Sequence, residues 1–206
     1  MTAPARNFPG RLNRFLKPAV FILCLVPLGV LVWNAFTGNL SANPIDDITD
    51  TTGTWTLRFV MITLAVTPLR KIFGWNFPGR VRRMLGLFTF FYATLHFSTY
   101  VYLDQFFDVE SILADIPKRP FILAGFTAFV LFIPLAVTST AGWVRRMGGK
   151  RWQLLHRLVY VSAIAGVVHY LWLVKADIQR PLIYGGVLAV LLGYRIMELI
   201  KIRPRR

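Results

Sequence analysis

Cysteine is almost absent from this chain, because Cys24 is the only one among 206 residues. A single thiol cannot form a disulfide within the chain, and it cannot build a thiolate site for zinc or an iron–sulfur cluster. The motif C-x-x-C-H, which attaches haem covalently, is excluded for the same reason. Since Cys24 lies inside an apolar run, we expect it to be a small buried hydrophobic residue.

Charged residues are also scarce. They make up 16% of the chain, whereas apolar and aromatic residues make up 55% and the mean hydropathy is +0.54. A soluble domain of this length needs more charged surface, so we predict a membrane protein. The 24 Lys and Arg outnumber the 9 acidic residues and give a net charge of +15. These cations form short clusters between apolar runs instead of one basic face, and we therefore exclude nucleic acid as a partner.

Six apolar segments approach the length of about 20 residues that a helix needs to cross a bilayer. They cover residues 18–36, 55–69, 84–103, 121–141, 152–174 and 181–200. The first follows several cations, as a signal peptide would, but its long run has no A-x-A-like end and is predicted to stay uncleaved. The predicted fold is an all-α integral membrane protein, a six-transmembrane-helix bundle over residues 18–200 surrounded by membrane lipid.

The charges predict the orientation of this bundle. If the N-terminus is cytoplasmic, most of the Lys and Arg fall in cytoplasmic segments, and nearly all of the acidic residues fall on the opposite side. An even number of spans then returns the chain to the same side. We therefore predict that both termini are cytoplasmic, with a cytoplasmic segment at 1–17 and a basic cytoplasmic tail at 201–206.

Three arginines lie within the predicted spans. Arg195 is followed one helical turn later by Glu198, and we expect these two to form an ion pair. Arg58 and Arg157 have no acidic residue within a turn. Each of these two either extends its side chain to the lipid headgroups or binds the carboxylate or phosphate of a cofactor.

All three histidines of the chain, His96, His156 and His169, lie in predicted spans. An intramembrane histidine can bond to a neighbouring helix, but three in the absence of thiolates favour axial ligation of haem iron. His96 precedes Asp104 by eight residues, and His169 precedes Asp177 by eight, so both lie at the same depth near the outer side. We predict that His96 and His169 are the two axial ligands of one b-type haem.

Small residues lie on the same helix faces as these two histidines. Such strips leave room for a flat macrocycle, although they also permit close packing between helices. They consist of Ala93, Thr89 and Gly86 before His96, and of Gly166, Ala165 and Ser162 before His169.

His156 lies thirteen residues before His169, which is about 20 Å along a continuous helix and on a different face. At its depth the third span offers Arg83 and no histidine. Three uses stay open for His156: binding of a flavin, binding of a quinone, or ligation of a second haem whose other ligand is unusual or absent.

Several short motifs occur along the chain: Asn43-Pro44, TGTW at 52–55, VTPLR at 66–70, RRMLGL at 82–87, Leu95-His96, DIPKRP at 115–120, TST at 138–140, WQLLHRLVY at 152–160 and His169-Tyr170. In combination they resemble the MsrQ family, which is also called YedZ. The resemblance extends over about residues 43–177, and the wider relationship is to the membrane domains of ferric reductases and NADPH oxidases. Those domains carry two histidines on each of two helices, whereas this chain has only one in its third span.

The resemblance implies a multi-pass protein of the bacterial inner membrane that conducts electrons and leaves catalysis to a partner. Its cofactors would be haem b and FMN. Its donor would be the quinone pool or a cytoplasmic flavin reductase, and its acceptor a periplasmic molybdopterin-containing methionine sulfoxide reductase that repairs oxidised proteins. No nucleotide-binding G-x-G-x-x-G is present, so the basic segments 70–83 and 145–151 are candidates for the FMN phosphate or are simply signals of membrane topology.

Two other functions are compatible with the residues. The first is a transmembrane reductase of the ferric-reductase or oxidase type, which would need a separate flavin dehydrogenase because this chain has no room for NAD(P)H and FAD sites. The second is a transporter with polar residues along its path.

Overall fold

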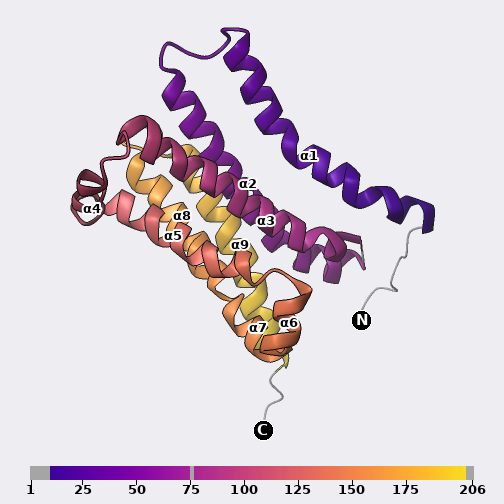
Figure 1. Cartoon of the computed structure of the whole chain (residues 1–206). Coiled ribbons are helices and arrows are strands. Elements are labelled where there is room, and N and C mark those ends of the chain that lie inside the picture. The colour runs from indigo at the N-terminus through magenta and orange to yellow at the C-terminus, as the bar shows by residue number, and fades with distance from the viewer. Residues whose placement is uncertain (1–9, 75–76, 203–206) are drawn as a thin grey trace.

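The computed structural model describes residues 10–74 and 77–202, and the regular secondary structure of these residues is entirely helical (Figure 1). The predicted segments 1–17 and 201–206 lie partly outside the described residues. Short elements occupy the connections: the π-helical turn η1 (Tyr100–Asp104), α4 (Val109–Lys118), α6 (Ala141–Met147) and α7 (Gly149–Leu155). The long helices are α1 (Gly10–Phe36), α2 (Pro44–Phe73), α3 (Phe77–Thr99), α5 (Pro120–Val137), α8 (Leu158–Leu173) and α9 (Gln179–Ile202).

Local sequence explains where α2 begins and ends. Pro44 occupies its first turn, where its missing N–H has no helical partner to lose, and Gly74 ends the helix in the left-handed conformation at φ 68°. Acidic residues lie in the first turn and basic residues in the last, which complements the helix dipole. The result is a helix of 30 residues that extends well beyond the predicted span at 55–69.

The core forms around two helix pairs, α2 with α3 and α5 with α8. One cluster joins all four of these helices to α9, with Leu64, Ala93, Phe132 and Ala163 among its buried residues. A second cluster joins α1 to α2 and α3, and Cys24 belongs to it at 3% exposure. The expectation that Cys24 is a buried hydrophobic residue is therefore confirmed.

Tyr92 attaches α1 to the rest of the bundle. Its hydroxyl donates a hydrogen bond to the carbonyl of Cys24 (2.9 Å) and accepts one from the N–H of Leu28 (3.1 Å). These two backbone groups are i and i+4 in α1, so the tyrosine is inserted into the hydrogen-bond ladder of the helix next to Pro27. The insertion makes α1 dependent on α3 for its backbone hydrogen bonding.

The outside of the bundle is apolar. Many large hydrophobic side chains are exposed, among them Phe15, Trp33, Trp172 and Val190, as a lipid-facing surface requires. In the described part of the chain, four helical segments are long and apolar enough to cross a membrane: Phe15–Phe36, Pro120–Val137, Gly149–Leu173 and Gln179–Ile200. The protein is thus a multi-pass membrane protein, and the predicted spans on α2 and α3 stay predictions.

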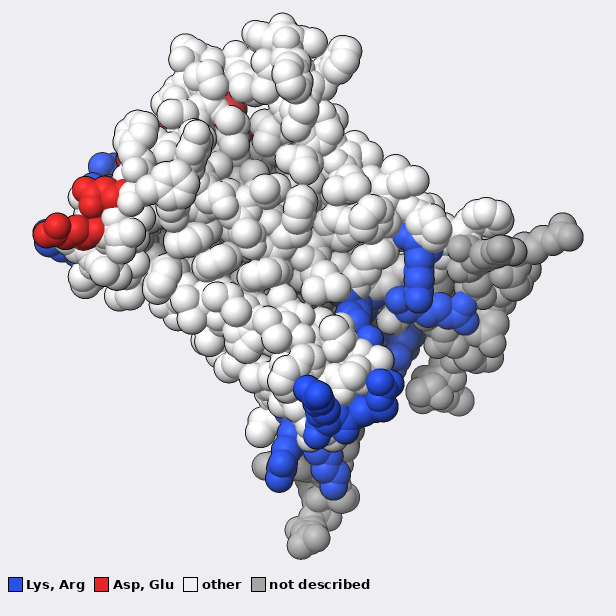
Figure 2. Space-filling view, in the orientation of Figure 1, with Lys and Arg blue, Asp and Glu red and all other residues white. Residues whose placement is uncertain are grey.

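Charge is separated along the length of the bundle (Figure 2). We call the end at which α4 lies the acidic end, because Asp104, Asp108 and Glu110 lie on or beside α4. We call the opposite end, at which α6 and α7 lie, the basic end. Its Lys and Arg include Arg82 and Arg83 on α3, Arg145 and Arg146 on α6, and Lys150 and Arg151 on α7.

The structure corrects two expectations. The predicted fifth span is not one continuous helix, because α7 ends at Leu155 and α8 begins at Leu158. Tight i→i+3 hydrogen bonds carry the chain through this break, such as that from the N–H of Arg157 to the carbonyl of Leu154 (3.1 Å). The expected ion pair of Arg195 with Glu198 is also wrong, since Glu198 pairs with Lys71 of α2.

Arg195 instead points into the bundle. One terminal nitrogen donates to the hydroxyl of Tyr160 (2.6 Å), and the other donates to the carbonyl of Leu64 (3.0 Å). Its guanidinium carbon also lies 5.0 Å from the centroid of the Tyr160 ring. Arg195 therefore joins α9 to α8 and α2, which the local i, i+3 spacing does not reveal.

The charge separation yields a prediction of orientation. A reporter fused after Arg206 is expected to be cytoplasmic, because cations are retained on the cytoplasmic side. Cysteine labelling in intact cells supplies an independent measurement. The native Cys24 is buried and is not expected to react with the label. A membrane-impermeant maleimide is expected to label Glu110→Cys at the acidic end and to leave Lys150→Cys unlabelled, and the reverse pattern would invert the assignment.

Candidate functional site

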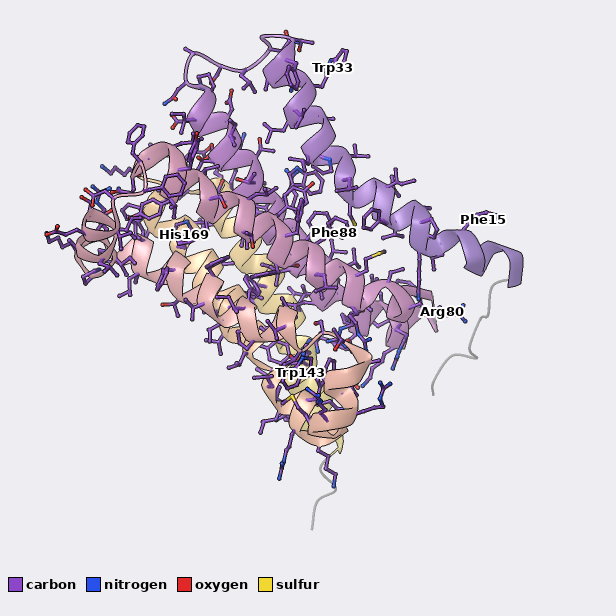
Figure 3. The ribbon with its side chains drawn as sticks, in the orientation of Figure 1. Phe15, Trp33, Arg80, Phe88, Trp143 and His169 are labelled. Atoms are coloured by element: carbon purple, nitrogen blue, oxygen red, sulfur yellow. The ribbon has the colours of Figure 1, made fainter. Side chains whose placement is uncertain are left out.

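A cavity lies between α2, α3, α5 and α8, and both His96 and His169 line it. Figure 3 shows His169 toward the acidic end, away from Arg80 and Trp143. The lining is mainly apolar and aromatic, with polar groups at the acidic end. It includes Leu57 and Val60 of α2, Ala93 and Phe97 of α3, Phe126 and Phe129 of α5, Ser162 and Gly166 of α8, and the polar residues Asp50, Tyr100, Asp104 and Arg119.

The cavity brings the two predicted ligands together from different helices. His96 lies near the end of α3 and His169 near the end of α8. Their ring centroids are 6.0 Å apart, and the ring planes are inclined by 74°. The two histidines therefore lie at the same level of the bundle, as residue counting predicts.

Each imidazole is held by a backbone carbonyl of a neighbouring helix. Nδ1 of His96 lies 3.0 Å from the carbonyl oxygen of Thr49 on α2, and Nδ1 of His169 lies 2.7 Å from that of Phe121 on α5. A carbonyl oxygen only accepts hydrogen bonds, so Nδ1 carries the proton in both rings. Nε2 of each ring is then left with a lone pair, which is the arrangement that a metal-binding histidine requires.

The ring spacing fits a single metal ion bound between the two imidazoles. Two metal–nitrogen bonds of about 2 Å, with about 1 Å from each nitrogen to its ring centre, place the centroids about 6 Å apart. No group of three or more His, Cys, Asp or Glu suited to a metal occurs among residues 10–74 and 77–202. Two nitrogen ligands in an apolar cavity suit a metal whose other ligands come from a macrocycle such as haem.

The small residues predicted to leave room for a macrocycle divide into two groups. Ala93, Ser162 and Gly166 line the cavity. Thr89 is instead buried at 2% exposure and bonds back to the carbonyl of Leu85 (3.1 Å). Gly86 and Ala165 are also not among the residues that line the cavity, and a Cβ at Gly86 would make only an ordinary contact with Thr63 at 3.9 Å.

His156 lies away from this cavity, at the break between α7 and α8. Its Nε2 is 3.0 Å from the hydroxyl oxygen of Thr138, and its ring stacks on Trp152 at 3.8 Å between centroids. The Trp152 indole donates to the carbonyl of Thr138 (2.9 Å), so the three residues form one local unit. The structure does not bring His156 together with His96 or His169.

Neither of the arginines predicted to bind a cofactor lines the cavity. The guanidinium carbon of Arg58 lies 4.6 Å from the Trp55 ring centroid, and its Nε donates to the hydroxyl of Tyr184 (3.2 Å). Arg157 is exposed at the break before α8. The arginine that does line the cavity is Arg119, at the start of α5.

Polar groups surround Arg119 at the acidic end of the cavity. Nε of Arg119 donates to Asp115 (2.8 Å), and the Tyr100 hydroxyl donates to the other carboxylate oxygen of Asp115 (3.1 Å). Asp50 lines the same end, before the predicted span on α2, and its pKa is raised by burial and further by the charge of Asp46. This end of the cavity therefore carries both a cation and carboxyl groups.

Sequence reasoning missed several residues of this site. The carbonyls of Thr49 and Phe121 cannot be recognised from the side chains at those positions, because every residue carries the same backbone carbonyl. Gly125 was detectable as a glycine inside a predicted apolar span, where glycine costs about 1 kcal/mol relative to alanine and needs a reason. Gly53 precedes the predicted second span and appeared only in the motif TGTW, and Arg119 appeared only in the motif DIPKRP.

Comparison with known proteins gives a consistent result. Residues 52–167 match the family model described as "Ferric reductase like transmembrane component". Several curated relatives share the name "Protein-methionine-sulfoxide reductase heme-binding subunit MsrQ". The relative from Herminiimonas arsenicoxydans is 56% identical over 88% of this chain and 84% of its own length. The relative from Rhodospirillum rubrum is 51% identical over 93% of this chain and 92% of its own length. No solved structure matches this chain.

Proposed function

Because this chain belongs to the MsrQ family of ferric-reductase-like membrane proteins, we propose that it is the haem-binding membrane subunit of a protein-methionine-sulfoxide reductase system. It passes electrons across the bacterial inner membrane, from a donor on the cytoplasmic side to a periplasmic molybdopterin-containing partner that reduces methionine sulfoxide. Catalysis belongs to the partner. A b-type haem supplies one-electron chemistry inside the membrane.

One observation carries this proposal: His96 and His169, from two different helices, line the same cavity with their ring centroids 6.0 Å apart. Both rings present Nε2 to the cavity, because Nδ1 of each is bonded to a carbonyl. The apolar lining would exclude water and hold a haem macrocycle, and His96 and His169 are the residues that would bind its iron. His169 lies toward the acidic end (Figure 3), which supports a redox centre near the side on which the acceptor is proposed to dock.

The donor side is proposed at the basic end. Cations of α3, α6 and α7 gather there, and they would attract the phosphate of FMN or acidic groups of a cytoplasmic flavin reductase. FMN is proposed as a second cofactor at this end, with segments 70–83 and 145–151 as candidates for its phosphate. His156 belongs to the same end, since it contacts Thr138 beside the start of α6.

The axial ligands can be tested directly. We expect His96→Ala and His169→Ala each to lose nearly all haem, because a b-type haem has no covalent link to retain it. The measurement is the haem-to-protein ratio of the purified protein together with its reduced-minus-oxidised spectrum. Either variant retaining a wild-type ratio with an unchanged spectrum would remove that histidine from the ligand set.

His156→Ala is expected to behave differently from the ligand variants. This histidine bonds to Thr138 and stacks on Trp152 outside the cavity, so the dithionite-reduced spectrum is expected to remain while reduction by quinol or by flavin reductase with FMN slows. The comparison of the two reductants on the same sample is the measurement. Loss of the haem spectrum in this variant, with His169→Ala unaffected, would place the haem at the basic end.

The haem carboxylates need a cation, and two arginines compete for this role. The sequence favours Arg58, whereas Arg119 is the arginine that the structure places on the cavity. We propose Arg119, because it lies at the polar end where propionates would reach water and because Arg58 is engaged with Trp55 and Tyr184. Asp115 orients the Arg119 side chain through its bond to Nε.

Arg119→Leu is therefore expected to lower the haem midpoint potential, since a nearby cation favours the reduced, less positive iron. The shift is on the order of 50 mV, from Coulomb's law at an effective dielectric constant near 20. Redox titration is the measurement, with Arg119→Lys as the rescue. Arg58→Leu is the matched control and is expected to leave the potential unchanged; a shift in Arg58→Leu alone would return the role to Arg58.

A further inference from the structure

The supports of the two facing histidines are built in the same way, although they come from different parts of the chain. His96 on α3 bonds to the carbonyl of Thr49, and the residue four positions after Thr49 is Gly53. His169 on α8 bonds to the carbonyl of Phe121, and the residue four positions after Phe121 is Gly125. In both cases the neighbouring helix supplies an acceptor at position i and a glycine at position i+4.

Helix geometry explains why a glycine occupies the i+4 position. The Cα–Cβ bond of a helical residue is tilted toward the N-terminus, so its side chain covers the turn that precedes it. The carbonyl at position i already accepts the N–H of residue i+4, and a side chain at i+4 would lie beside that carbonyl. With glycine at i+4, an imidazole from another helix can approach this oxygen without meeting a Cβ.

The distances agree with this account. A Cβ built on Gly53 would lie 2.9 Å from Cε1 and 3.0 Å from Nδ1 of His96. A Cβ on Gly125 would lie 2.7 Å from Nδ1 and 3.0 Å from Cε1 of His169. By contrast, a Cβ on Gly193 of α9 would meet nothing within 4 Å. The contacts at Gly53 and Gly125 are closer than a side chain tolerates, so each imidazole rests directly on the glycine.

We propose that Gly53 and Gly125 are positioning residues that, with the carbonyls of Thr49 and Phe121, hold the two imidazole planes crossed. This inference rests on the haem binding proposed above. Each ring is restrained twice, by the direction of its Nδ1 bond and by contact with the glycine. The inclination of 74° between the rings is then imposed by α2 and α5 and is not left to the cofactor.

Crossed ligand planes have an electronic consequence. Each imidazole donates π-electron density into the iron d orbital perpendicular to its own plane, so crossed planes act on two orbitals almost equally and keep them close in energy. Ferric low-spin haem with nearly degenerate orbitals gives a strongly anisotropic electron paramagnetic resonance signal with a large maximum g value. Parallel planes separate the orbitals and give a rhombic signal with a smaller one.

The first test uses the wild-type holoprotein. Its ferric electron paramagnetic resonance spectrum is expected to show the strongly anisotropic low-spin signal of crossed imidazoles. A rhombic spectrum typical of parallel planes would overturn the inference while leaving haem binding by His96 and His169 intact. Absence of haem from the purified protein would instead overturn the proposed function on which the inference rests.

The second test uses Gly53→Ala and Gly125→Ala, with Gly193→Ala as the matched control. The added methyl is expected to displace the ring from its carbonyl, which lowers the maximum g value. It is also expected to raise the midpoint potential, because a ligand without its Nδ1 bond is less basic and donates less to ferric iron. Gly193→Ala is expected to change neither quantity.

The outcomes of this second test are distinct. A variant that remains helical by circular dichroism but binds less haem than Gly193→Ala also supports the positioning role, because the ring no longer presents Nε2 correctly. Full haem occupancy with an unchanged spectrum and an unchanged potential in both glycine variants would contradict it. If a variant fails to fold, the wild-type spectrum still tests whether the two imidazole planes are crossed.

Discussion

The bond from each histidine Nδ1 to a carbonyl of the adjacent helix is the interaction on which this site depends. It sets the tautomer, directs Nε2 into the cavity and fixes the rotation of each ring. It also requires that α3 lie against α2 and that α8 lie against α5, which are the two pairs around which the core is built. The helix packing and the proposed haem site therefore depend on each other, since a shift of either helix pair would change the relative positions of the two imidazoles.

The four helices around the cavity differ in hydrophobicity. On α2 and α3, buried hydroxyl side chains such as Thr52 and Thr89 bond back to carbonyls of their own helix. The helices α5 and α8 line the same cavity, yet they belong to segments of continuous apolar sequence. Hydropathy alone therefore does not distinguish a helix that lines the cavity from one that faces only lipid.

The two ends of the bundle differ in their charged groups and in their local structure. At the acidic end, Arg119, Asp115 and Tyr100 form a polar group at the cavity. At the basic end, the chain breaks between α7 and α8, and His156 lies beside Thr138 and Trp152 at that break. The proposed electron transfer needs different surfaces for a donor and an acceptor, and the separation of charge is a difference of that kind.

Residue counting was enough to match His96 with His169, because depth along a helix depends only on the rise per residue and on where the helix enters the membrane. The helical fold, the lipid-facing segments and the burial of Cys24 followed from hydropathy for a similar reason, since these properties depend on the solvent and on local composition. Contacts between helices do not follow from either. Arg195 turned toward Tyr160 instead of Glu198, Arg119 and not Arg58 reached the cavity, and Gly53 and Gly125 acquired a role only when the rings of other helices were placed against them. Those outcomes depend on the rotation and separation of packed helices, which are settled by the simultaneous packing of all their side chains and which no single segment of sequence specifies.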